Sequence, residues 1–248
     1  MYGLLLLGLF AGFCSAALGI GGGVVMVPAL MLFFNYKIKR AIGTSLATIV
    51  PTSYVAIVSH YFVNSANIKI TIALVIILGS IFGASFGAKL ANRLSSSILR
   101  KLFAVLLLFT GLKLSGIVNI PTQSITSGAY PLLILLGLVA GSASALFGIG
   151  GGVIMVPVLN LFFGLTIHEA IATSLTVILP TTFAGAMFHR KFDNINLGAL
   201  KFLLPTALVG AICGAIFANS IPAPTLKVIF GVFLLFCSVR IFFQRKEK

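Results

Sequence analysis

The chain has 248 residues, of which 59% are hydrophobic and only 8% are charged, and its mean hydropathy is +1.18. Soluble domains carry about a quarter charged residues, so this composition excludes an ordinary water-facing surface. The 17 Lys and Arg outnumber the three Asp and Glu, but they are scattered among long apolar runs, which excludes a nucleic-acid-binding surface. The sequence therefore predicts an all-α polytopic membrane protein embedded in a lipid bilayer.

The first 34 residues form an apolar unit that a single straight helix does not explain. Residues 2–34 would make a helix of about 50 Å, whereas the apolar part of a bilayer is about 30 Å thick. The motif Gly19-Ile20-Gly21-Gly22-Gly23 interrupts the unit, and glycine is unfavourable inside a helix. We expect two short helices that meet at the glycines and form a hairpin, which either is re-entrant or barely spans the membrane.

Ordinary membrane spans follow in chain order. A transmembrane helix needs about 20 apolar residues, and three segments after the hairpin satisfy this requirement: residues 43–63, 68–90 and 98–118. A polar stretch, residues 119–128, separates them from a second interrupted unit, residues 130–163. Three further spans are expected over residues 170–189, 195–218 and 224–243.

The second set of elements is a copy of the first. Gly19–Gly23 recurs 129 residues later as Gly148–Gly152, and the matches continue through Thr44-Ser45 with Thr173-Ser174, Pro51-Thr52 with Pro180-Thr181, and His60 with His189. Such self-similarity indicates a duplication. We therefore expect a first repeat over residues 1–120, a linker over residues 121–129, and a second repeat over residues 130–248.

The cations indicate how the repeats lie in the membrane. If each interrupted unit is a hairpin, all but three of the 17 Lys and Arg (Lys69, Lys113 and Lys227) fall on one side. If each unit crosses the membrane once, the cations divide almost equally. Because cytoplasmic loops are rich in Lys and Arg, the hairpin is favoured, with both termini in the cytoplasm and the protein in the cell (inner) membrane.

A hairpin followed by three spans makes an odd number of crossings in each repeat. The two repeats would therefore insert in opposite orientations, as inverted repeats related by a pseudo-two-fold axis in the membrane plane. Many secondary transporters have this architecture, and they bind substrate near the middle of the membrane where broken helices meet.

The glycine motifs are the first candidate site. N–H groups at the start of a helix lack partners within the helix and attract anions, and glycine lets a ligand approach the backbone. The candidate residues are Gly21, Gly22, Gly23, Gly150, Gly151 and Gly152. The alternative is that these glycines only allow helices to pack closely.

Hydroxyl side chains form the second set of candidates. Thr44, Ser45, Thr173 and Ser174 are expected to begin the next span of each repeat, and Thr52 and Thr181 follow prolines that are expected to break those spans. Hydroxyls can donate to an oxyanion, or they can cap helices and bond to their own backbone. His60 and His189 are candidates for proton coupling, although each lies about 13 Å beyond the proline and hence near an interface.

The positions of the acidic residues indicate the charge of the substrate. Glu169, Asp193 and Glu247 are expected in loops or in the tail, so no predicted span contains a carboxylate. Cation carriers normally embed one, so an anion is favoured. The chain has no hydrolase, nucleotide-binding or cysteine–histidine metal motif, and we expect no enzyme activity, cofactor, metal or nucleotide. Assembly into a homo-oligomer is left open.

The order of these motifs resembles the TauE/SafE family of membrane permeases. The resemblance is carried by Gly19–Gly23, then Val27-Pro28, then Ala41-Ile42-Gly43-Thr44-Ser45, and by the second copy, in which Ala172 replaces the glycine of Gly43. It covers essentially the whole chain. It implies a secondary transporter, in most members an exporter, of a small sulfur-containing anion such as sulfite, thiosulfate or an organosulfonate, which we expect to work by alternating access. A passive anion channel and an importer of the same substrates are the alternatives.

Overall fold

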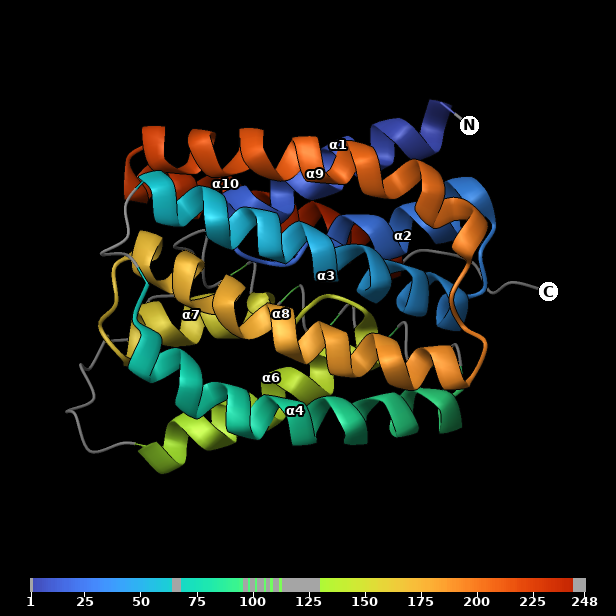
Figure 1. Cartoon of the computed structure of the whole chain (residues 1–248), viewed down its shortest axis with the longest axis horizontal. Helices are drawn as coiled ribbons and strands as arrows, with labels where there is room; N and C mark the ends of the chain where they lie inside the picture. The colour runs from blue at the N-terminus through green and yellow to red at the C-terminus, as the bar shows by residue number, and fades with distance from the viewer. Residues whose placement is uncertain are drawn as a thin grey trace.

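The computed structural model describes residues 2–63, 68–95 and 130–242, together with residues 98, 101, 105, 108 and 112. The regular structure of these residues is entirely α-helical, in a bundle of helices that lie side by side (Figure 1). The helices are α1 (Tyr2–Leu18), α2 (Gly23–Phe34), α3 (Ile38–Val63), α4 (Ile70–Arg93), α6 (Tyr130–Phe147), α7 (Gly152–Phe162), α8 (Ile167–Lys191), α9 (Leu197–Ser220) and α10 (Ala223–Phe242). The predicted all-α class is confirmed, while the predicted linker, residues 121–129, lies outside the described residues.

Several helices are suited to cross a membrane. α3, α4, α6, α8 and α9 are long and apolar enough to do so, and α1 and α2 are shorter apolar helices. Large apolar side chains are exposed on the outside of the bundle, among them Phe10, Phe82, Phe86 and Phe236, which is the surface that lipid requires. The chain is therefore a multi-pass membrane protein. Of the predicted spans, 98–118 lies largely outside the described residues.

Both interrupted units break at the glycine motifs, as the sequence predicts. Gly22 and Gly151 cap α2 and α7 with φ values of +72° and +85°. A side chain is strained in this left-handed conformation, whereas glycine adopts it readily. The glycines therefore end one helix and let the chain begin the next in a new direction.

The first unit is a hairpin. A Cβ atom built on Gly3 would lie 3.1 Å from the ring of Phe34, so the end of α2 returns to the level at which α1 begins. A straight unit would separate these two residues by about 45 Å.

The starts of α3 and α8 differ from the prediction. α3 begins at Ile38 and α8 at Ile167, so the Thr-Ser pairs lie inside these helices rather than at their first residues. A capping box starts α8: the Thr166 hydroxyl accepts from the Glu169 N–H, and the Glu169 carboxylate accepts from the Thr166 N–H. Glu169 therefore belongs to the first turn of a helix and not to a loop.

The prediction that prolines break the spans is also wrong. α3 continues through Pro51 and α8 through Pro180. Each proline removes only one backbone donor, and hydroxyls beside it bond to the helix backbone, with Thr52 Oγ1 3.0 Å from Thr48 O and Thr181 Oγ1 2.7 Å from Val177 O. Neighbouring hydroxyls of this kind let membrane helices tolerate proline.

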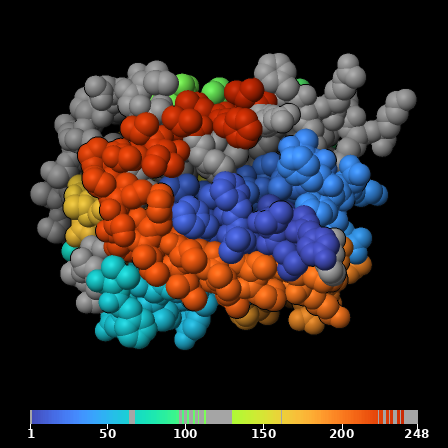
Figure 2. All heavy atoms as spheres, turned by 90° about the horizontal axis from the view of Figure 1, so that it is seen from above, coloured from blue at the N-terminus to red at the C-terminus, as the bar shows by residue number. Residues whose placement is uncertain are grey.

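The two halves interlock through closely packed helix pairs. α1 lies along α9, and α6 lies along α4; Figure 2 shows α1 in dark blue against α9 in orange. A Cβ atom on Gly12 would overlap Ala207 O, and one on Gly141 would overlap Ser80 O. Small residues thus let the paired backbones touch, as in other membrane helix pairs.

Equivalent helices of the two halves run in opposite directions. In Figure 1, α1 runs from the end that carries the N-terminus, whereas α6 runs toward that end. Lys39 Nζ donates to Asn92 O at 2.6 Å, which brings the start of α3 and the end of α4 to this same end of the bundle. These directions are the ones that an inverted repeat requires, while the orientation in the membrane stays a prediction.

Candidate functional site

The two glycine motifs cross at the centre of the molecule. A Cβ atom on Gly21 would lie 3.0 Å from Ile149 O and 3.3 Å from Gly150 Cα. The starts of the following helices are equally close to the opposite motif, because a Cβ atom on Gly23 would overlap Gly148 O and one on Gly152 would overlap Gly19 O. All residues of both motifs are buried.

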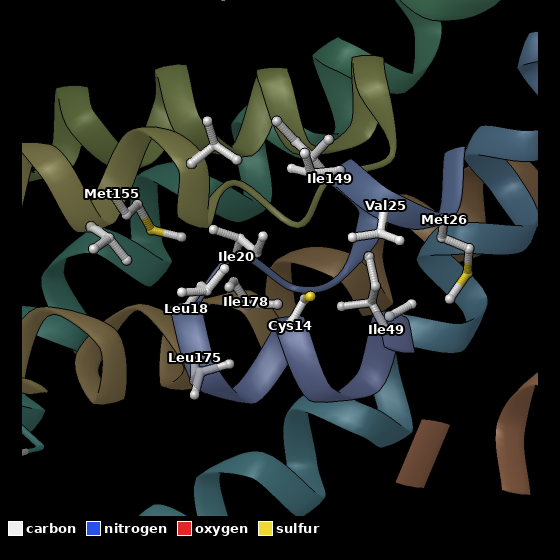
Figure 3. Packing of buried hydrophobic residues seen from close by; sticks show 14 of the residues in the cluster. Cys14, Leu18, Ile20, Val25, Met26, Ile49, Ile149, Met155, Leu175 and Ile178 are labelled. Carbon is white, nitrogen blue, oxygen red and sulfur yellow. The ribbon is translucent and has the colours of Figure 1, made fainter. Parts of the chain in front are cut away.

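Apolar side chains from both halves surround this crossing. Figure 3 shows Ile20 and Ile149, one from each motif, among buried side chains that include Ile49 of α3 and Ile178 of α8. Each of these isoleucines is at most 1% exposed. The glycine motifs therefore lie in an apolar interior, where backbone polar groups are costly to leave without a partner.

The helix starts at the crossing carry backbone donors without partners. Among the described residues, the N–H groups of Gly21, Gly22 and Gly23 form no hydrogen bond, and the same holds for Gly150, Gly151 and Gly152. Gly22 and Gly151 have no side chain that could cap these helices. Unpaired N–H groups at two helix N-termini, each at the positive end of a helix dipole, form an environment that suits an anion.

Ser45 and Ser174 hold the opposite motif in place. Ser45 Oγ donates to Gly148 O at 2.7 Å, and Ser174 Oγ donates to Gly19 O at 2.8 Å. Each serine therefore ties its own repeat to the glycine motif of the other. Because a hydroxyl has one proton, each would have to give up this bond in order to donate to a substrate, and the predicted role in binding stays a prediction.

The threonine candidates lie apart from the crossing. Thr44 Oγ1 accepts from the Asn196 N–H at 3.0 Å, and Thr173 Oγ1 accepts from the Lys69 N–H at 3.1 Å. These contacts fasten the connections that precede α9 and α4. Thr52 and Thr181 bond to their own helices, as described above, and their predicted contact with substrate is likewise untested.

The two histidines clamp the last turns of α1 and α6. His60 Nε2 lies 2.9 Å from Ala16 O, and His189 Nε2 lies 2.8 Å from Ala145 O. A carbonyl only accepts, so the proton is on Nε2 in each case. Nδ1 of His60 lies 3.1 Å from Asn219 Nδ2 and accepts from it. This pattern satisfies a neutral imidazole, and proton coupling through His60 and His189 stays a prediction.

The structure draws attention to two residues that were absent from the predicted site. Ser15 and Ser144 are 1% and 0% exposed, and within the described part of the chain their hydroxyl oxygens have no hydrogen-bond partner. A buried polar group without a partner costs about 1–3 kcal/mol. The signal available in the sequence was their identity in the two repeats, at the same offset as the glycine motifs.

The chain is similar to known membrane proteins over almost its whole length. The family model described as "Sulfite exporter TauE/SafE" matches residues 1–114 and 133–248. Among curated proteins, the chain is 31% identical to "Probable membrane transporter protein YdhB" of Bacillus subtilis, over 93% of this chain and 97% of that protein. It is 30% identical to "Probable membrane transporter protein MJ0441" of Methanocaldococcus jannaschii, over 84% of this chain and 80% of that protein.

A third relative extends this agreement. "Probable membrane transporter protein YunE" of Bacillus subtilis is 27% identical over 97% of both chains. No solved structure matches the chain. The family match spans both repeats, each with its own glycine motif, and the chain therefore belongs to the TauE/SafE family of membrane transporters.

Proposed function

We propose that this protein is a secondary transporter that exports a small sulfur-containing anion, such as sulfite, thiosulfate or an organosulfonate, by alternating access. The observation that carries the proposal is the pair of helix N-termini at the crossing of the glycine motifs, whose buried N–H groups have no partner among the described residues. Such groups stabilise negative charge.

The charge distribution supports an anion over a cation. Of the three acidic residues, Glu169 and Asp193 are described, and both lie at helix ends outside the buried interior. Cation carriers normally embed a carboxylate, whereas a path without carboxylates does not repel an anion. The family description names sulfite, which supports the choice of sulfur oxyanions within the anions.

The opposed directions of α1 and α6 support alternating access. In transporters with inverted repeats, one repeat rocks against the other around a central site. At the crossing of the glycine motifs the backbones of the two repeats meet closely in the buried interior. Accumulation of cations at the end that holds Lys39 and Arg93 supports placing that end at the cytoplasmic face of the cell membrane.

Flux measurements in liposomes test this function. Purified protein is reconstituted, the liposomes are loaded with unlabelled sulfite, thiosulfate or methanesulfonate, and uptake of the ³⁵S-labelled anion is followed. We expect saturable uptake that the internal anion accelerates, with protein-free liposomes as the control. Uptake without acceleration would indicate a passive channel, and no flux of any sulfur anion would contradict the proposal.

The direction of transport needs oriented membranes. Everted vesicles expose the cytoplasmic face, so an exporter accumulates the labelled anion in everted vesicles when the driving gradient is imposed. An importer accumulates it in right-side-out vesicles under the equivalent gradient. Accumulation only in right-side-out vesicles would overturn the export direction while leaving transport of the anion in place.

A further inference from the structure

Two buried serines stand beside the unpaired helix starts. Ser15 lies in the last turn of α1 and Ser144 in the last turn of α6, and both are at most 1% exposed. Neither hydroxyl has a partner among the described residues. Other buried hydroxyls in the described part of the chain bond to carbonyls of their own helix, as Ser53 Oγ does to Val50 O at 3.0 Å.

The glycine caps bring these serines to the candidate site. A Cβ atom on Gly22 would lie 3.3 Å from Ser15 Cβ and 2.5 Å from Ala11 O, one turn earlier on α1. The second repeat repeats the arrangement, because a Cβ atom on Gly151 would lie 2.9 Å from Ala140 O, one turn before Ser144. Ser15 is therefore next to the start of α2, and Ser144 lies one helical turn beyond the residue that faces the start of α7.

The duplication retained these serines and the alanine after each one, Ala16 and Ala145, while other neighbours changed. Cys14 of the first repeat corresponds to Ala143, and Ala17 corresponds to Leu146, whereas Ser15 corresponds to Ser144. Alanine is smaller than serine and would remove the unpaired hydroxyl, so packing alone favours its replacement. A requirement for the hydroxyl itself explains why both copies keep it.

The backbone beside each serine is fixed in position. His60 bonds to the carbonyl of Ala16 at 2.9 Å, and His189 bonds to the carbonyl of Ala145 at 2.8 Å. These carbonyls belong to the residues that follow Ser15 and Ser144. The two histidines therefore hold the last turns of α1 and α6 and, with them, the serine hydroxyls beside the glycine caps.

We propose that Ser15 and Ser144 bind the transported anion, each donating its hydroxyl proton to an anion oxygen that the neighbouring glycine N–H groups also contact. The proposal rests on the proposed function and names two of its binding residues, one in each repeat. Both kinds of donor are electrically neutral, so the anion is held by hydrogen bonds and helix dipoles. It can then be released when the repeats move, because no Lys or Arg among the described residues is buried to retain it.

The test compares Ser15→Ala, Ser144→Ala and the double variant with Ser53→Ala, a buried serine whose hydroxyl is satisfied within its own helix. Thermal unfolding in detergent is measured with and without sulfite, thiosulfate, methanesulfonate, phosphate or chloride. We expect at least one sulfur anion to raise the unfolding temperature of the unchanged protein. Ser15→Ala and Ser144→Ala should weaken this binding about 10-fold or more without lowering the unfolding temperature of the anion-free protein. Ser53→Ala should bind the anion normally.

Flux in liposomes separates this proposal from the proposed function. If the unchanged protein binds an anion through Ser15 and Ser144 but carries no sulfur anion, the binding residues stand and the transport function fails. If it carries sulfur anions and the serine variants carry them equally well, the transport function stands and the binding role of the two serines is overturned. The proposal is also overturned if no anion in the panel stabilises the unchanged protein, or if the serine variants lose binding only in proportion to a loss of anion-free stability.

Discussion

α4 and α9 hold equivalent places in the two repeats and begin at opposite ends of the bundle (Figure 1). The residue directly before each helix donates a hydrogen bond from its backbone N–H. The Lys69 N–H donates to Thr173 Oγ1 at 3.1 Å, and the Asn196 N–H donates to Thr44 Oγ1 at 3.0 Å. The same bond thus fastens each connection to the central helix of the other repeat.

The side chains of these two residues make different contacts. Lys69 Nζ forms an ion pair with Glu169 at 2.7 Å, whereas Asn196 Nδ2 donates to the hydroxyl of Tyr36 at 2.7 Å. The side chain of Lys69 is thus held by an ion pair, and the side chain of Asn196 by a hydrogen bond between neutral groups. The duplication has kept the contacts made by backbone and has let the contacts between side chains diverge.

Equivalent substitutions in the two repeats should therefore affect stability in a way that depends on the contact they remove. Where the repeats share a backbone contact, paired substitutions should have equal effects. Where the side chains have diverged, the paired effects should differ in size or in their dependence on salt.

The largest effect is expected at the glycines that start α2 and α7. A Cβ atom on Gly23 would overlap Gly148 O, and one on Gly152 would overlap Gly19 O. Both contacts are with backbone, which cannot rotate away as a side chain can. Gly23→Ala and Gly152→Ala should therefore each prevent recovery of folded, monodisperse protein in detergent, and to the same extent.

Gly185→Ala is the matched control for these glycines. Gly185 lies inside α8, and the nearest atoms to a Cβ there are the Leu46 and Ala145 side chains, at 3.3 and 3.5 Å. Since alanine favours a helix over glycine by about 1 kcal/mol, this variant should fold at least as well as the unchanged protein. If Gly23→Ala folded and Gly152→Ala did not, the prediction that the two repeats respond equally would be wrong.

The next effect is expected at the serines that bond to the glycine motifs. Ser45→Ala leaves Gly148 O without its partner, and Ser174→Ala does the same to Gly19 O. A buried acceptor without a partner costs about 1–3 kcal/mol, so each variant should unfold at a lower temperature, and by similar amounts. Thermal unfolding in detergent measures this.

Ser85→Ala is the control, since the Ser85 hydroxyl is exposed and donates to Ile81 O within α4. It should unfold at the temperature of the unchanged protein. If Ser45→Ala were destabilising and Ser174→Ala neutral, the two glycine motifs would differ in how firmly the opposite repeat holds them.

The features that the sequence predicted correctly depend on local chemistry or on the duplication. The helix breaks at Gly19–Gly23 and Gly148–Gly152 follow from the conformational freedom of glycine. The long apolar segments predict α3, α4, α8 and α9 by length alone. The capping box at Thr166 and Glu169 is also a local pattern that the sequence contains, and it would have placed the start of α8 correctly.

The features that the sequence did not predict depend on contacts between distant segments. Ser45 and Gly148 are 103 residues apart, and only the crossing of the repeats brings them together. The hydroxyl of Ser15 is notable because nothing among the described residues pairs with it, and an absent partner leaves no pattern in a sequence. The continuity of α3 through Pro51 depends on neighbouring hydroxyls whose direction is set by the folded helix.

The smallest effect is expected at the two ends, where the repeats differ. Glu169→Gln removes the ion pair with Lys69 but keeps a side chain that can complete the capping box. Exposed ion pairs contribute about 0.2–1 kcal/mol, and here the Lys69 side chain is 43% exposed. Tyr36→Phe removes the acceptor of Asn196 Nδ2, and a neutral hydrogen bond contributes about 0.5–1.5 kcal/mol.

The dependence on salt concentration distinguishes the destabilisation by Glu169→Gln from that by Tyr36→Phe better than their magnitudes do. Ions screen an exposed pair such as Lys69–Glu169, so the destabilisation caused by Glu169→Gln should shrink as the salt concentration of the unfolding buffer rises. The destabilisation caused by Tyr36→Phe should stay constant, because neither partner is charged. If both losses shrank in parallel with salt, the ends would not differ in the way that their side chains indicate. A salt dependence confined to Glu169→Gln would show that the duplicated ends share their backbone contact and differ in the forces that close them.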